Sequence, residues 1–363
     1  MSLGRKALRS LPALLGALLF CGAIYVVQKE FRHLKIADIK TAMDAIPYRS
    51  LGISGVFAIL AYGVLTFYDR LGTIYAGNVV SYKRVAFASF CAYALSHNLG
   101  FAAVSGAAVR YRLYTHWGLT PLQIGKVIAF CSLTFALGAG VLGGVVLFTE
   151  PEALPFFGNS VPVWILYIVG AAMWLTVLAY VVASKFLGTF RMFGHEVQLP
   201  QWRMALMQVA LATVDVAVTA AIMHALLPAA PGLTYLRFLG VYLASYTAGL
   251  AANVPGGLGV FDTAMLLGLS PYLSPPQILG AVVVFRLYYY IIPLFLAGGL
   301  FTGNELMLRG RGLIGRMAGF LGATPDARLS EPDFAVAAAA SAVAMCGGLL
   351  LILGVIEPDS DFS

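Results

Sequence analysis

The stretch "AANVPGGLGVFD", Ala251–Asp262, decides how this chain folds. It places an Asn, a Pro, three Gly and an Asp inside a run that otherwise resembles an apolar helix. The hydrocarbon of a bilayer offers no partner to a freed backbone N–H or C=O, so broken backbone at membrane depth must be enclosed by protein or border a polar cavity. We therefore predict a binding site at this stretch.

The composition is that of a membrane protein. Of 363 residues, 60% are hydrophobic and only 11% are charged, whereas soluble domains carry roughly 25% charged residues. A helix of about 20 apolar residues spans a bilayer. The fold class predicted is therefore an all-α polytopic membrane protein with about seven full spans, at 11–27, 50–68, 127–148, 161–183, 204–227, 278–301 and 335–356.

The two ends of the chain differ from the middle. The basic N-terminus leads into an apolar run that reaches Val27 without an A-x-A site, so we expect an uncleaved first span rather than a signal peptide. The segment 28–49 has the pattern of an interfacial helix. A basic cytoplasmic linker, 311–334, precedes an extra span with an acidic tail, 335–363.

Charged loops predict two segments that do not cross. By the positive-inside rule, Arg and Lys place the N-terminus and both ends of 85–109 on the cytoplasmic side, and base-free loops place both ends of 236–270 outside. One stretch of this length cannot cross twice at about 20 residues per crossing. Each segment is therefore predicted to be a re-entrant helical hairpin.

Because a hairpin does not cross the membrane, each half of the chain crosses it an odd number of times. The two halves are therefore inverted relative to each other. We predict a membrane domain, 1–310, with inverted repeats at about 1–149 and 160–303. Interrupted helices at matching places in such repeats are typical of secondary transporters. The alternative is two ordinary kinked spans with one loop misassigned.

Three motifs resemble a known family: "HNLGFAAVSGAAVRYRLYTHWGLT" (His97–Thr120), "AANVPGGLGVFD" and "VFRLYYYIIPLFLAGG" (Val284–Gly299). They resemble the membrane flippase region of the multiple peptide resistance factor family, over about residues 5–310. More loosely, they resemble the wider set of lysylphosphatidylglycerol synthase transmembrane-region proteins. The resemblance implies that lysylphosphatidylglycerol moves from the inner to the outer leaflet, which lowers the negative surface charge and gives resistance to cationic antimicrobial peptides. The family's cytoplasmic lysyltransferase domain has no counterpart here, so we do not expect the chain to transfer aminoacyl groups by itself.

Arginines are the candidate phosphate ligands, because a guanidinium can hold two phosphate oxygens at once. Arg286 lies inside an apolar run, where an ionisable residue indicates function; the alternative is a structural ion pair. Arg110 and Arg112 end the first hairpin and are expected to meet phosphate at its cytoplasmic mouth. Arg112 is equally explained as a positive-inside anchor.

Two carboxylates are candidate partners for a lysyl ammonium or for Arg286. Asp215 is flanked by apolar residues on both sides, which favours a buried role over a side chain that faces lipid without a function. Asp262 closes the second hairpin, or simply caps a half-helix.

The hairpin tips complete the predicted substrate site. Asn98 and Asn253, with Gly256 and Gly257, would aim backbone N–H groups at phosphate, or let helices pack closely. Tyr289 lines the groove or belongs to an interfacial aromatic belt.

Other kinds of site are not predicted. There is no Walker loop, no G-x-S-x-G and no cysteine or histidine spacing for a metal, so we expect no catalytic residue, no metal and no cofactor. The expected partners are a membrane phospholipid, a separate lysyl-lipid synthase and a second copy in a homodimer, but not nucleic acid. The expected location is the bacterial cytoplasmic membrane. The alternatives are a membrane subunit of a lysylphosphatidylglycerol synthase system, and a translocase for another anionic or polyprenyl lipid.

Overall fold

A computed structural model describes most of the chain between residues 41 and 304. The first predicted span, most of the interfacial helix, the basic linker, the last span and Asn253 lie outside the described residues. The chain forms two compact units, Met1–Tyr290 and Ile291–Ser363, and the contacts below lie within the first. The described residues are 41, 44–77, 80–99, 102–151, 161–192, 195–251, 255–257 and 259–304.

Five helices are long and apolar enough to cross a membrane, which confirms the prediction of a polytopic helical membrane protein. They coincide with the five predicted spans that fall in the described region. They are α3 (Tyr48–Tyr75), α6 with α7 (Pro121–Ser132 and Thr134–Thr149), α8 (Val163–Phe186), α9 (Trp202–His224), and α12 (Pro275–Arg286), which continues through a π-helical turn, η4 (Leu287–Ile291), as far as Asn304.

A small β-hairpin connects α8 to α9. Its strands, β1 (Thr189–Met192) and β2 (His195–Gln198), pair antiparallel, with Thr189 opposite Gln198. The predicted spans 161–183 and 204–227 left this region as a connecting loop without strands.

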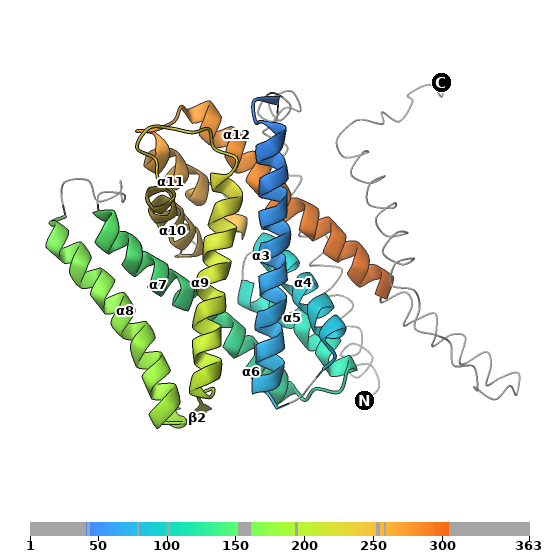
Figure 1. Ribbon diagram of the computed structural model, residues 1–363. Helices are drawn as coiled ribbons and strands as arrows, with labels where there is room; N and C mark the ends of the chain where they lie inside the picture. The colour runs from blue at the N-terminus through green and yellow to red at the C-terminus, as the bar shows by residue number, and fades with distance from the viewer. Residues whose placement is uncertain are drawn as a thin grey trace, which may run out of the picture. The chain divides into compact units, whose positions relative to one another are not determined.

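Shorter helices form two helical hairpins. The first consists of α4 (Tyr82–Leu99) and α5 (Ala102–His116), and the second of α10 (Tyr235–Ala251), the 3₁₀ turn η3 (Pro255–Gly257) and α11 (Val260–Leu269). The two hairpins lie toward opposite ends of the α3–α9 pair (Figure 1). The described structure contains no membrane, so the re-entrant character of the hairpins stays a prediction.

Contacts at both ends of the α3–α9 pair fix this arrangement. The two helices run antiparallel, because Ser54 near the start of α3 donates to the carbonyl of Ile222 near the end of α9, at 2.9 Å. At one end of the pair, Arg70 of α3 donates to the Val80 carbonyl just before α4, at 2.6 Å. Beyond the middle of α9, Tyr235 at the start of α10 donates to the Ala217 carbonyl, also at 2.6 Å.

Glycine explains why the second hairpin breaks where it does. Gly256, Gly257 and Gly259 have φ of 58°, 65° and 78°. This left-handed region costs a residue with a Cβ roughly 1–2 kcal/mol, which glycine avoids. The described glycines of Ala251–Asp262 therefore lie in the turn between α10 and α11.

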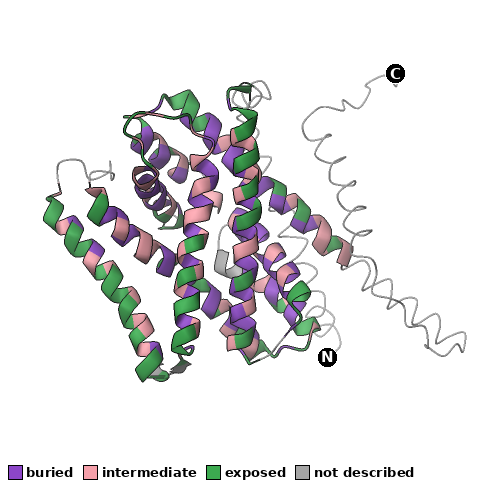
Figure 2. Ribbon diagram, viewed as in Figure 1, coloured by how far each residue is buried: buried purple, intermediate pink, exposed green. Residues whose placement is uncertain are grey.

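Close packing through small residues joins the spans. A side-chain carbon at Gly138 of α7 would overlap the backbone carbonyl of Ala212 on α9, and one at Gly144 would overlap the indole of Trp174 on α8. Small residues let membrane helices approach in this way. By contrast, α8 leaves most of its apolar surface exposed (Figure 2), as expected of a helix that faces lipid.

Candidate functional site

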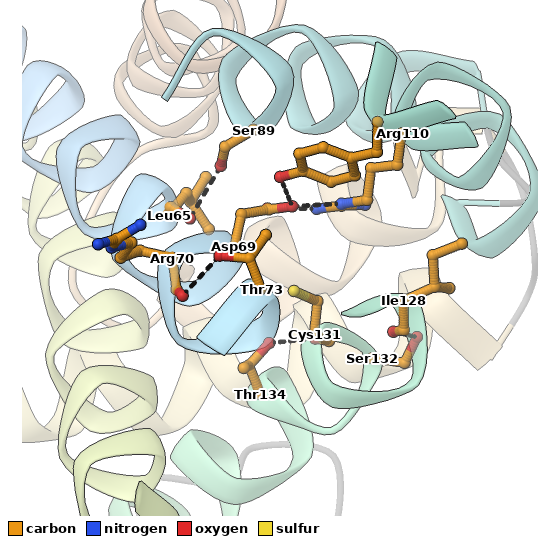
Figure 3. A network of polar contacts seen from close by, with 11 residues as sticks. Leu65, Asp69, Arg70, Thr73, Ser89, Arg110, Ile128, Cys131, Ser132 and Thr134 are labelled. Carbon is orange, nitrogen blue, oxygen red and sulfur yellow. Dashed lines mark hydrogen bonds and ion pairs between the residues drawn. The ribbon is translucent and has the colours of Figure 1, made fainter. Parts of the chain in front are cut away.

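A buried ion pair ties the first hairpin to α3. The Arg110 guanidinium of α5 holds both oxygens of Asp69, with Nε–Oδ1 at 2.7 Å and Nη2–Oδ2 at 2.8 Å, and the Tyr114 hydroxyl donates to Oδ1 at 2.9 Å (Figure 3). The side chains of Arg110 and Asp69 are 6% and 0% exposed. Fork-on-fork geometry makes this one of the stronger types of polar contact, and the pair fixes where α5 lies against α3.

Asp69 is not among the site residues predicted from the sequence. It comes just after the predicted span 50–68 and directly before Arg70, which gives it the pattern of a loop charge. In the structure α3 continues to Tyr75, so Asp69 lies well inside the helix. The available signal was the apolar "LGTIY" that follows, which extends the span beyond both charges.

A second ion pair joins the second hairpin to α12. Arg286 donates to both oxygens of Asp262, with Nη2–Oδ1 at 2.7 Å and Nη2–Oδ2 at 2.9 Å, and its Nη1 donates to the Gly256 carbonyl at 3.2 Å. Asp262 also accepts the backbone N–H of Gly259 at 2.9 Å, so it caps α11 as well. Its side chain is 23% exposed and that of Arg286 is 9% exposed. This pair is more open than the pair at Asp69.

The tip of the first hairpin contacts the turn η4 at the end of α12, close to where the second hairpin pairs with Arg286, and we call this contact region the joint. The side-chain amide of Asn98 donates to the Tyr290 carbonyl at 3.0 Å, and Tyr62 of α3 donates to the Tyr289 carbonyl at 3.0 Å. Both acceptors lie in the π-helical turn η4. A π turn interrupts the regular i→i−4 bonding of a helix and occurs often at functional sites.

Aromatic rings fill the space around this joint. The imidazole of His97 stacks on the Tyr289 ring with centroids 5.0 Å apart, and the Phe285 ring also stacks on Tyr289, with centroids 5.7 Å apart. A side-chain carbon built on Gly256 would lie 3.9 Å from the His97 carbonyl oxygen. The two hairpin tips are therefore in contact.

The structure gathers five of the predicted site residues around this joint: Asn98, Gly256, Asp262, Arg286 and Tyr289. Gly257 lies beside them, and a Cβ built on Gly249 of α10 would lie 3.3 Å from the Gly257 Cα, so the missing side chain at Gly249 lets η3 approach α10.

Three predicted site residues lie elsewhere. Arg110 is paired with Asp69, and its predicted role at a phosphate stays a prediction. Arg112 follows on α5, half-buried, two residues on and therefore on a different face of the helix. Asp215 lies on α9, whereas Asp262 and Arg286 lie on α11 and α12. Within the part of the chain that the structure describes, no three His, Cys, Asp or Glu side chains gather as metal ligands.

Known proteins resemble this chain over most of its length. No family model matches it. It is 32% identical over 295 residues to the uncharacterized protein slr0712 of Synechocystis sp., which covers 81% of this chain and 91% of that protein. It is 30% identical over 242 residues to the inner membrane protein YbhN of Escherichia coli, 66% of this chain and 75% of that protein.

A more distant likeness covers part of a longer protein. The chain is 24% identical over 306 residues to the phosphatidylglycerol lysyltransferase of Staphylococcus haemolyticus, which is 81% of this chain but 34% of that enzyme. The chain thus spans about a third of the lysyltransferase. The likeness to slr0712 and YbhN is higher and covers a larger share of those proteins' own length, and this chain belongs to the membrane protein family that contains those two proteins.

Proposed function

We propose that this protein moves phospholipid headgroups across the bacterial cytoplasmic membrane, and that it carries aminoacylated phosphatidylglycerol, such as lysylphosphatidylglycerol, from the inner to the outer leaflet. The likeness to phosphatidylglycerol lysyltransferase supports the substrate class, and the inner membrane protein YbhN supports the location. Export of this lipid makes the cell surface less negative and protects against cationic antimicrobial peptides. The observation that carries the proposal is the partly open Arg286–Asp262 pair where the two hairpins meet.

The charges of the pair complement those of the lipid. A lysylphosphatidylglycerol headgroup carries a phosphate anion and two ammonium groups. Arg286 would hold the phosphate in place of Asp262, and Asp262 would take an ammonium in place of Arg286. Because a charge at the centre of a bilayer costs at least about 2.5–3.5 kcal/mol, a matched pair of partners lowers the barrier to crossing.

The helix bounds support an inverted repeat. Pro121 opens α6 and Pro275 opens α12, 154 residues later (275 minus 121), and each helix is 12 residues long. Each begins with a capping box, at Thr120 and at Ser274. Tyr48 and Trp202, which open α3 and α9, are also 154 residues apart (202 minus 48).

This correspondence supports the finer architecture that we propose. The matched helices α3 and α9 run in opposite directions (Figure 1). We propose seven full spans, a cytoplasmic N-terminus, and hairpins that re-enter the membrane from opposite faces. Inverted repeats of this kind give a transporter two equivalent arrangements, one open to each side.

A leaflet assay tests the proposal. The purified full chain is placed in vesicles that contain lysylphosphatidylglycerol, and an impermeant amine reagent measures the share of the lipid in the outer leaflet over time. In Arg286→Gln the loss of a charge-assisted bond, about 1.5–3 kcal/mol, should slow translocation about tenfold or more. The matched control is Arg237→Gln, which breaks the pair with Glu150 and should leave the rate unchanged. Equal rates in both variants would remove Arg286 from the pathway.

The second candidate is a membrane subunit that presents lipid to a separate lysyl-lipid synthase. The observation in its favour is the name of the lysyltransferase relatives, which describes aminoacyl transfer. The two candidates differ in what the gene changes in cells. A translocase alters the outer-leaflet share of lysylphosphatidylglycerol at constant total, whereas an enzyme subunit alters the total. Vesicles with another anionic lipid or a polyprenyl phosphate test the remaining alternative substrates, and cross-linking tests a homodimer.

A further inference from the structure

Asp215 lies near the middle of the α3–α9 pair. Helix α9 is 23 residues long, about 34 Å at 1.5 Å per residue, and Asp215 lies about 20 Å from its start. Ser54 contacts Ile222 at one end of the pair, and Tyr75 contacts Gln198 at the other. Asp215 therefore lies in the middle third of α9, away from both ends of the helix pair.

Two polar atoms on this face of α9, the Asp215 Oδ1 and the Thr219 hydroxyl oxygen, have no hydrogen-bond partner among the described residues. The Asp215 Oδ1 atom is sealed from solvent and unpartnered. Thr219 lies one turn later on the same face; its side chain is buried, at 5% exposed, and its hydroxyl is also unpartnered. Buried polar groups are nearly always hydrogen-bonded, so an unpartnered pair points to a ligand.

Among the residues that the structure describes, the titratable groups around Asp215 are phenols rather than cations. Its carboxyl group lies within electrostatic range of tyrosines on three neighbouring elements, while Arg286 and Arg110 pair with Asp262 and Asp69. From α7 no titratable side chain faces it within Thr134–Thr149, and Tyr180 of α8 is bound to Gln208. The tyrosines are Tyr62 and Tyr68 of α3, Tyr242 and Tyr246 of α10, and Tyr289 of η4.

A proton fits this site better than a metal cation. An isolated carboxylate in a low-dielectric interior is costly and becomes neutral by binding a proton. Hard metal cations take about six or more oxygen ligands, whereas Asp215 and Thr219 offer two oxygen-bearing side chains. Carboxylates within membrane spans serve as proton relays in pumps and transporters.

We propose that Asp215, assisted by Thr219, binds the proton that drives lipid export, an inference that rests on the proposed function. The carboxylate takes up one proton from the outer side and becomes a neutral acid, with the Thr219 hydroxyl as its hydrogen-bond partner. It releases the same proton to the inner side as one lipid headgroup moves outward. No covalent bond in the lipid changes, and one proton enters for each lipid exported.

Vesicles with an imposed pH gradient test this coupling. The purified full chain is placed in vesicles with lysylphosphatidylglycerol, an internal pH dye and an external amine reagent. With one proton per lipid, a gradient of one pH unit should shift the ratio of lipid between the leaflets about tenfold, against the direction of proton flow. Asp215→Asn should still exchange lipid but reach the same ratio with and without the gradient.

A pair of threonine variants serves as the matched control. Thr219→Val should weaken the response to the gradient, whereas Thr213→Val should keep it, because the Thr213 hydroxyl already donates to the Val209 carbonyl on the same helix. If Asp215→Asn does not fold, lipid-dependent proton uptake by the unmodified protein and the two threonine variants decide the matter. Lipid exchange that ignores the gradient, or a gradient response that survives Asp215→Asn, would overturn the coupling. A complete lack of lipid exchange would instead overturn the proposed function.

Discussion

Replacing Asp69 by Asn should weaken the attachment of the first hairpin to α3 and destabilise the protein. The substitution keeps the shape of the side chain but removes the charge that compensates Arg110, and both side chains are almost fully buried, at 0% and 6% exposed. Removing one partner of a buried ion pair typically costs about 3–5 kcal/mol, because the other charge is left uncompensated. The Tyr114 hydroxyl also loses a charged acceptor. We therefore expect the free energy of unfolding to fall by about 3–5 kcal/mol.

The control is a pair of the same chemistry in a more open place. Arg237 and Glu150 are 34% and 19% exposed, with Nε–Oε2 at 2.7 Å. Solvent screens such a pair, so Glu150→Gln should lower the free energy of unfolding far less than Asp69→Asn does. The measurement is equilibrium unfolding of the purified protein in mixed micelles of a mild detergent and SDS, followed by circular dichroism.

A double variant separates charge from packing. Asp69→Leu with Arg110→Met removes both charges and keeps an apolar interior, so it should recover most of the stability lost in Asp69→Asn. If Asp69→Asn costs no more than Glu150→Gln, the pair does not hold the hairpin. If the double variant is no more stable than Asp69→Asn, the loss has a cause other than an uncompensated charge.

Two glycine pairs give further predictions. Gly138→Ala should lower the free energy of unfolding by about 1–3 kcal/mol because its methyl group would overlap the Ala212 carbonyl. Gly63→Ala is the control and should not destabilise the protein in the same unfolding assay, because a Cβ there would have nothing within 4 Å. Equal losses in the two variants would contradict the close packing of α7 on α9. Gly256→Ala and Gly77→Ala both place a side chain on a residue with left-handed backbone, φ 58° and 77°, and each should lower the free energy of unfolding by about 1–2 kcal/mol. Only Gly256→Ala should slow translocation in the vesicle assay. Equal translocation rates in the two variants would show that the hairpin tip has no part in transport.

The spans could be predicted because each is a long apolar run, and hydropathy over about 20 residues needs no knowledge of partners. Details within the runs could not be predicted in this way. The break at Leu133, between α6 and α7, carries no Pro or Gly, and it was read as part of one span. The β1–β2 hairpin is four residues per strand, too short for a clear alternation of side chains to stand out from a loop.

The candidate site shows the same division. The sequence indicated that Arg286 and Asp262 are functional or paired, because charges are rare in such apolar surroundings, but several pairings were compatible with it. The contact across 24 residues needs the turn at Gly256 to bring α11 back to α12. Asp69 and Arg110 are 41 residues apart, and no local pattern links them. Partner choice depends on how helices pack, which a single sequence does not report.

The joint between the first hairpin and the last described helix has a consequence for how this protein can evolve. The side chains of Asn98 and Tyr62 donate to the backbone carbonyls of Tyr290 and Tyr289. The hydrogen-bond acceptors are therefore present whatever side chains occupy positions 289 and 290. Substitutions in the π-helical turn η4 can therefore leave these two hydrogen bonds intact, provided that the backbone of the turn keeps its conformation. Relatives that differ throughout this turn can share the same attachment, and a comparison of residue identities alone would overlook it.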